Sequence, residues 1–249
     1  MNTLIFKAPR AMSAPIPGTP TLPLIGDDWE LALFASDFVD SYADGAITSS
    51  LLARGASGAD SLRTFKPRAG WSGAVLDHDA APGGKPALIF NGNASMEAQL
   101  YLLPQPSTVI VMIRMDEYPF GETGRVFGGA SGYVNSVDIR GGQKLRLRAW
   151  SNSPGQEFAG PPLGTWTPVV SVFNGAECKV KVGMGPIVTL AEAGSDSMFL
   201  MALGASTSQA TANGLGLKGG IAELRRFARA FSDQEIDAMV GNMYQKYAV

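Results

Sequence analysis

The sequence predicts an all-β protein, an antiparallel sandwich of two sheets followed by one amphipathic helix. Short apolar segments, several with period-two alternation, follow one another along most of the chain. Turns separate them, because 30 glycines and 16 prolines in 249 residues exceed the usual combined share of about 12%. A helical pattern occupies the end of the chain. An apolar fraction of 45% and a charged fraction of 17% suit a globular protein with a full core.

Residues 1–26 are predicted to form an extended, proline-rich arm. Prolines recur at positions 9, 15, 17, 20 and 23, and they exclude this segment from helices and central strands. A disordered tail is one interpretation, and an arm that orders against a neighbouring subunit is the other. The segment is more apolar than a free tail usually is, which favours the arm. The residues expected to contact the neighbour are Leu4, Ile5, Phe6, Leu22, Leu24 and Ile25.

The globular body is predicted to span residues 27–249. It begins with a strand in which Trp29, Leu31 and Leu33 alternate, and a short helical piece follows before Gly45. Residues 52–85 are rich in turns and give no clear strand. An Asn-Gly pair at 174–175 predicts a hairpin turn. Further strands are expected at 87–90, 96–103, 108–115, 124–127, 134–139, 144–150, 167–173, 178–182 and 198–203.

The last strand and the C-terminal helix have the clearest signals. Ser232 is followed three residues later by Glu235, which is the pattern of a capping box. Phe231 and Ile236 flank this cap as a hydrophobic staple. One apolar stripe, expected to lie against the sandwich, contains Ile236, Met239, Val240, Met243, Tyr244 and Tyr247.

These features together resemble a concanavalin A-like jelly roll of the laminin G-like type, across residues 27–249. The final motif is the most specific part: a strand reading GGIAEL, the turn RAFSD, and a helix that ends in KY. Three weaker motifs occur in the order typical of the family. They are Trp29–Gly45, Gly84–Gly92 and Phe173–Gly175.

The resemblance implies a two-sheet jelly-roll sandwich in a family whose members bind glycans, bind proteins or serve structurally. We expect a non-enzymatic structural protein of a bacteriophage particle, either capsid decoration, a fibre or a tail-associated protein. Its arm would be held by other virion proteins, and a homo-oligomer is expected. The expected localisation is the virion, after synthesis in the host cytoplasm, because no secretory signal is visible. The alternative is a bacterial cell-surface carbohydrate-binding module.

Catalytic residues are not recognisable, so no enzyme is expected. Relatives that cleave glucans usually carry Glu-x-Asp-x-x-Glu or Glu-x-Asp-x-Glu on one strand, and this sequence has neither pattern. Asp116 and Glu117 are adjacent, so on a strand they would point to opposite faces. The one histidine, His78, is expected in a solvated loop, and the one cysteine, Cys178, in the core.

Composition argues against several partner classes. A net charge of −2 provides no global basic field for nucleic acid. No apolar run approaches the ~18 residues that a membrane span needs, so no membrane insertion is expected. No cofactor is expected. Structural calcium would suit the loops of this fold, but Asp77 and Asp79 lack a third acidic residue at a fixed interval, so no metal site is predicted.

The candidate binding site is one face of the strand predicted at 144–150. Alternation places Leu145, Leu147 and Ala149 inward and the basic and aromatic residues outward. Aromatic faces stack on sugar rings, and guanidinium groups bind carboxylates in bidentate fashion, so anionic cell-surface polysaccharide is a candidate partner. A solvated sheet face or a contact between subunits are the alternatives. The site residues are Lys144, Arg146, Arg148 and Trp150, with Tyr133 as a further exposed aromatic candidate.

Overall fold

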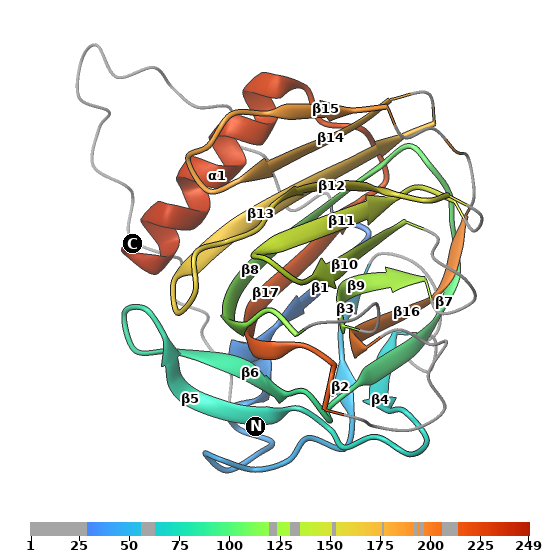
Figure 1. Ribbon diagram of the computed structural model, residues 1–249. Coiled ribbons are helices and arrows are strands. Elements are labelled where there is room, and N and C mark those ends of the chain that lie inside the picture. Colours follow the sequence, from blue (N-terminus) through green and yellow to red (C-terminus); the bar gives the residue numbers. More distant parts are fainter. Residues whose placement is uncertain are drawn as a thin grey trace, which may run out of the picture.

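The computed structural model describes residues 29–55, 63–119, 124–129, 135–150, 153–175, 177–191, 194, 197–205 and 214–249. Within them it confirms the predicted antiparallel jelly-roll sandwich with one C-terminal helix. Figure 1 shows the two sheets stacked on each other, with the helix along one side. The arm residues expected to contact a neighbour, Leu4 to Ile25, and the candidate Tyr133 lie outside the described residues.

One sheet, here called the helix-side sheet, contains nine strands in the described part of the chain. In spatial order, seven of them are β15 (Val188–Leu190), β14 (Glu177–Val182), β13 (Trp166–Asn174), β8 (Ser107–Glu117), β17 (Lys218–Phe227), β1 (Leu31–Phe34) and β3 (Arg54–Gly55). Strand β6 (Lys85–Asn91) also pairs with β17, and β5 (Val75–Ala81) pairs with β6.

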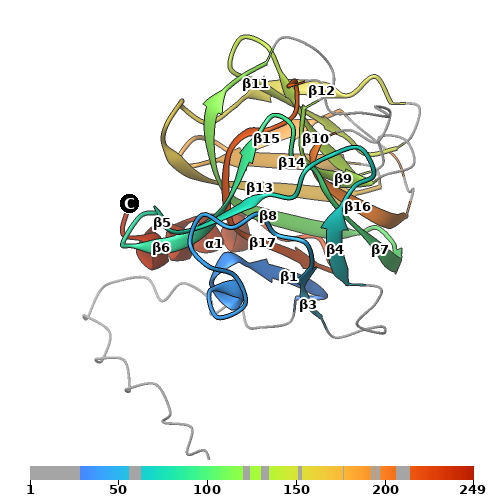
Figure 2. The same cartoon turned by 90° about the horizontal axis from the view of Figure 1, so that it is seen from below.

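The second sheet contains eight strands among the described residues. Their order is β12 (Gln156–Ala159), β11 (Lys144–Arg148), β10 (Ser136–Arg140), β9 (Gly124–Gly129), β16 (Met198–Ala205), β7 (Met96–Leu103), β4 (Thr64–Pro67) and β2 (Leu51–Leu52). The edge strands β12 and β15, which belong to different sheets, lie at the same end of the sandwich (Figures 1 and 2).

Strand β8 confirms the prediction of a central strand at residues 108–115. It lies between β13 and β17, and both of its faces are covered. Val109, Val111 and Ile113 belong to the main core between the two sheets. Ile110 and Met112 belong to a second apolar cluster on the other face of the helix-side sheet. Both faces are buried, so the strand is a continuous apolar run instead of an alternating one.

Helix α1 (Asp233–Tyr247) covers this second cluster, and its predicted capping box is confirmed. The Ser232 hydroxyl accepts a hydrogen bond from the Glu235 backbone N–H, and the Glu235 carboxylate accepts one from the Ser232 backbone N–H. Ile236 and Phe231, the predicted staple pair, are both buried in the cluster. The capped first turn therefore fixes where the helix meets the sheet.

A buried carboxylate also fastens the helix to strand β17. Glu223 on β17 has no exposed side-chain surface, and it forms an ion pair with Lys246 near the end of the helix. The Tyr247 hydroxyl donates a hydrogen bond of 3.1 Å to the same carboxylate, and the Arg225 Nε atom lies 2.5 Å from its other oxygen. Burial, together with the charge of Glu223, raises the pKa of Tyr247 well above its usual value. The outer face of the helix-side sheet is thus closed by both apolar packing and charge.

Several local predictions need correction. Residues 52–85 contain strands β4 and β5 as well as β3, and His78 lies within β5 and not in a loop. His78 is half-buried, and its ring Nε2 atom is 3.1 Å from the Tyr42 carbonyl oxygen. Strands β12 and β15 were not predicted, because each is short and partly polar. Cys178 is fully buried, as expected. No helix in the described residues has the length and apolar character needed to cross a membrane.

Candidate functional site

Strand β11 confirms the predicted alternation but corrects the predicted exposure. Leu145 and Leu147 point into the main core, and Arg146 and Arg148 lie on the opposite, outer face of the second sheet. Both arginines are nevertheless buried, with only 6% of their surface exposed. Lys144 at the start of the strand is exposed, and Trp150 just after its end keeps 37% of its surface exposed. Of the four residues predicted to be exposed along this strand, only the two at the ends, Lys144 and Trp150, are therefore exposed.

The arginines are buried because Asp138 on the neighbouring strand holds them. The strand register places Asp138 opposite Arg146 on β11 and opposite Arg125 on β9. One carboxylate oxygen lies 3.1 Å from the Arg125 Nε atom. The other lies 3.2 Å from Arg148 Nε and 3.5 Å from Arg146 Nη2. Three guanidinium groups from two strands thus surround one carboxylate from the strand between them. We call Arg125, Asp138, Arg146 and Arg148 the arginine cluster.

Glycines let the backbone approach this cluster closely. Gly155 has a φ of +74°, and a Cβ atom at this position would come within 2.8 Å of side-chain carbons of both Arg146 and Arg148. On the other side, a Cβ at Gly128 would lie 3.1 Å from the Arg125 side chain. The Arg125 Nη1 atom donates a hydrogen bond of 2.7 Å to the Gly129 carbonyl oxygen. Close backbone cover explains why charged side chains on an outer sheet face are shielded from solvent.

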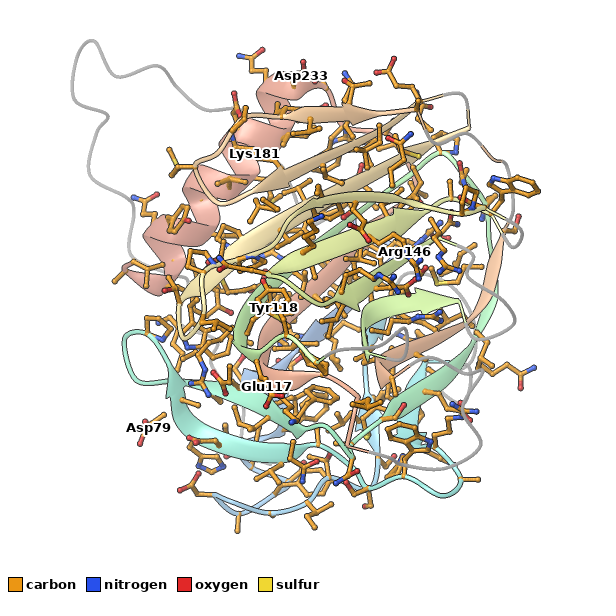
Figure 3. The ribbon with its side chains drawn as sticks, viewed as in Figure 1. Asp79, Glu117, Tyr118, Arg146, Lys181 and Asp233 are labelled. Carbon is orange, nitrogen blue, oxygen red and sulfur yellow. The ribbon has the colours of Figure 1, made fainter. Side chains whose placement is uncertain are left out.

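The cluster places three guanidinium groups around one carboxylate. Burial raises the pKa of Asp138, while the charges of Arg125 and Arg148 act in the opposite direction. Arginine stays protonated in such surroundings, so three positive charges face one carboxylate. Each arginine also makes further interactions. Figure 3 shows Arg146 extending from β11 among the side chains of this sheet.

The two exposed residues, Lys144 and Trp150, have different surroundings. The Lys144 ammonium group donates a 3.1 Å hydrogen bond to Glu157 on β12, and Arg140 on β10 approaches the same carboxylate at 3.4 Å. The hydrogen bond from Lys144 holds the pKa of Glu157 below its usual value. At the other end, the Trp150 side chain lies against Gly194, where a Cβ atom would come within 2.7 Å. Trp150 therefore rests on backbone and keeps part of its surface open.

The acidic residues weighed for catalysis or metal binding are not brought together. Asp116 forms an ion pair with Arg114 on the same strand, and Glu117 forms one with Lys218 on β17. Figure 3 labels Glu117 at the end of β8, away from Arg146. Asp77 accepts a hydrogen bond from the Asp79 backbone N–H, which is a local contact within β5. Within the described ranges, no group of three or more metal-ligating side chains is present.

Sequence reasoning missed two members of the cluster. Neither Arg125 nor Asp138 was among the predicted site residues. A signal was present, because charged residues occur between apolar neighbours on three successive predicted strands. Such charges must face one another if the strands are adjacent in one sheet. Trp166 on β13 is buried in the helix-covered cluster, as expected for a core residue, and its indole N–H donates to the Ala80 carbonyl oxygen on β5.

Comparisons with known proteins identify the fold but no family. No protein-family model matches the sequence, and no curated protein matches it either. A structure of Trypanosoma rangeli sialidase with the inhibitor DANA is similar, with a TM-score of 0.54 and 14% identity over 84% of this chain and 32% of the sialidase chain. The same sialidase with sialic acid gives a TM-score of 0.52 and 14% identity, over 87% of this chain and 33% of that one.

A bacterial toxin domain is similar to about the same extent. The binding domain of botulinum neurotoxin DC, in complex with SialylT, gives a TM-score of 0.56 and 10% identity. The match covers 87% of this chain and 52% of the toxin chain. This chain thus spans about a third of the sialidase and half of the toxin chain. At these identities the likeness establishes the β-sandwich fold alone, and membership of the concanavalin A-like superfamily and its laminin G-like type stays a prediction.

The first test concerns the charge balance of the cluster. Asp138→Asn should lower the free energy of unfolding by about 3–5 kcal/mol, because it leaves three buried guanidinium groups without their carboxylate. Glu157→Gln is the matched control, since this exposed carboxylate pairs with Lys144 and Arg140 in the same sheet, and its loss should cost no more than ~1 kcal/mol. Urea unfolding measures both. Equal effects of the two variants would show that Asp138 does not hold the arginines together.

Proposed function

We propose that this protein is a non-enzymatic recognition domain that binds an acidic carbohydrate on the outer face of its second sheet. The observation that carries the proposal is the arginine cluster, three guanidinium groups around one carboxylate, on the strand that leads to the half-exposed Trp150. The charge of guanidinium groups held just below the surface attracts carboxylates, and an exposed aromatic face stacks on a sugar ring. The exposed Lys144, which also pairs with Glu157, lies at the other end of the same strand.

The shape of the site suits an extended polymer better than a single sugar. Lys144 and Trp150 are six residues apart along β11 and its continuation, which corresponds to about 20 Å at the rise of a β-strand. A ligand that contacts both must therefore be several sugar units long. Because Arg146 and Arg148 are mostly covered, they act through their charge, and direct contacts fall to Lys144 and Trp150.

Two of the similar structures are consistent with this class of ligand. The sialidase structure holds sialic acid, a sugar that carries a carboxylate, and the toxin binding domain was solved with SialylT. These ligands belong to those proteins. They support the proposal only in that the same sandwich fold occurs in proteins whose ligands include acidic sugars.

A non-catalytic role agrees with the arrangement of the acidic side chains. A glycosidase needs two carboxyl groups about 5–9 Å apart across the scissile bond. In the described residues, Asp116 and Glu117 are each held by a basic side chain, and Asp138 is enclosed by arginines. No two of these three carboxylates therefore form the free pair that a glycosidase places across the scissile bond. This is the support for binding without turnover.

We further propose that the domain works as part of a bacteriophage particle, where the N-terminal segment anchors it to neighbouring subunits. The support is the sequence of residues 1–26, which combines stiffening prolines with apolar residues before the first strand. The folded body would then be displayed as capsid decoration, a fibre or a tail-associated protein. A bacterial cell-surface carbohydrate-binding module is the alternative setting, and it would use the same face of the second sheet.

Binding to acidic polysaccharide tests the proposed ligand class. On a glycan array, the full chain should bind polymers that contain uronic or sialic acids in preference to neutral ones, and the signal should fall as salt is raised. Trp150→Ala should weaken binding about tenfold or more, which corresponds to the loss of about 1.4 kcal/mol of stacking energy. Lys144→Gln should weaken it by about threefold to tenfold through the lost charge.

Matched variants separate the site from the rest of the sheet. Leu52→Ala removes an exposed apolar side chain, and Lys66→Gln removes an exposed charge, both at the opposite edge of the second sheet. Both should bind like the wild type. Unchanged binding by Trp150→Ala and Lys144→Gln would rule out this face as the site. Release of sugar fragments from any bound polymer would instead show an enzyme.

Deletion of the N-terminal segment tests the particle proposal. Protein that lacks residues 1–26 should remain folded, with an unchanged circular dichroism spectrum, but should fail to enter particles when it is produced with their other structural proteins. The physical reason is the lost burial of the apolar arm, which contributes about 25 cal/mol per Å² of apolar surface. Normal incorporation of the truncated protein would overturn the anchoring role.

A further inference from the structure

An apolar pocket lies at the end of the sandwich where the two edge strands β12 and β15 come near each other. Its volume is about 290 Å³. Phe158 from β12 and Val180 from β14 form part of the lining, and both also belong to the main core. Val188 from β15 lies at the edge of the lining and is 39% exposed. The two sheets are thus not fully closed here, and part of the core can be reached from outside.

The surroundings of this pocket are apolar as well. Leu163 and Met184, which flank the lining in sequence, are 53% and 77% exposed. The lining itself consists of aliphatic and aromatic side chains, glycines and prolines, with no charged or hydroxyl side chain. A carbohydrate would leave its hydroxyl groups without hydrogen-bond partners in such a site. This apolar lining therefore suits apolar side chains of a polypeptide better than it suits a sugar.

The N-terminal segment of the chain has a short stretch that fits these requirements. Leu4, Ile5 and Phe6 precede the first proline, so this stretch retains its backbone N–H groups for pairing with a strand. In extended conformation Leu4 and Phe6 point to the same side. Since β15 is the outermost strand of the described helix-side sheet, an added strand at this edge would direct two apolar side chains toward the pocket.

The length of the segment favours a pocket on a second copy of the chain. Its attachment point, Trp29, is packed partly against the helix-covered cluster and edge-to-face with Phe34, at a ring distance of 6.3 Å. The proline-rich part between positions 9 and 23 would span about 45 Å as a semi-rigid extended spacer. Strand β1, which follows Trp29, is five positions away from β15 in the helix-side sheet, which is about 24 Å at the usual spacing of strands. An extended spacer of about 45 Å therefore overshoots the pocket of its own body, which favours the pocket of a second copy.

We propose that residues Leu4–Phe6 of one copy of this protein add to the edge strand β15 of a second copy and insert Leu4 and Phe6 into the pocket between β12 and β14–β15. This assignment rests on the proposed anchoring role of the N-terminal segment and specifies what the segment binds. It makes the contact heterologous, because the segment and the pocket are different surfaces. Repetition of the contact then links copies head to tail, into a ring or a chain.

Disulfide trapping between two single-cysteine variants tests this contact in the full chain. The native Cys178 is buried and stays unreactive. Phe6→Cys is mixed with an equal amount of Val188→Cys that carries a larger tag, and the covalent heterodimer is followed on non-reducing gels. The matched control replaces Val188→Cys with Ile47→Cys, which is 63% exposed and lies outside the pocket lining. The pocket pair should cross-link at least about tenfold faster, because docking raises the effective concentration of the two thiols.

Three results would overturn the proposal. Equal rates for the pocket and control pairs would mean that the arm does not dock at β15. A double variant with both Phe6→Cys and Val188→Cys that forms its disulfide only within one chain would exclude docking on a second copy. The third result is that Val188→Lys keeps the oligomeric mass of the wild type, while deletion of residues 1–26 gives a monomer. This result would leave the anchoring role of the segment intact but would reject this pocket as its binding site. Val188→Lys that becomes monomeric, with Ile47→Lys unchanged, would support it.

Discussion

The carboxylate of Asp138 is the interaction on which the outer face of the second sheet depends. Each buried ion costs several kcal/mol to remove from water, so three guanidinium groups can be covered only if an opposite charge lies among them. The register of β9, β10 and β11 supplies that charge in the middle strand. Because the arginines are held from both sides, their guanidinium groups keep fixed positions on this face. These fixed guanidinium groups are the basis of the proposed affinity for acidic carbohydrate.

The opposite face of the sandwich also contains a buried charged group with partners of opposite charge. There, Glu223 is buried together with Lys246, Arg225 and Tyr247, and helix α1 covers the sheet. The Glu223 carboxylate itself has no exposed surface, and its ion pair with Lys246 holds the helix on this face. The two outer faces therefore differ in kind. One is closed by a helix, and the other, beside β11, is covered closely enough to order its arginines while Trp150 and Lys144 remain accessible.

Much of the fold could be predicted from sequence, because the relevant signals are local. The capping box at Ser232, the buried run in β8 and the alternation of Leu145 and Leu147 were all confirmed. The site was only partly predictable. Alternation assigns a side chain to a face, but it cannot show that Gly155 brings backbone over Arg146 and Arg148. Nor does it show which carboxylate they meet, since Asp138 reaches them through pairing with another strand. Short, partly polar strands such as β12 and β15 escaped prediction for the same reason, because their pairing is non-local.

The most direct measurement is an NMR titration that follows the Nε–Hε signals of arginine and the indole N–H signals of tryptophan as an acidic oligosaccharide is added. The account predicts saturable shifts of the Trp150 indole signal and of the Arg146 and Arg148 Nε–Hε signals, with no response to the neutral oligosaccharide of equal length. It predicts no shift for the Trp166 indole, which is buried under helix α1 on the other face. Shifts confined to residues outside the second sheet, or equal responses to both sugars, would contradict the claim that the arginine cluster makes this face a site for acidic carbohydrate.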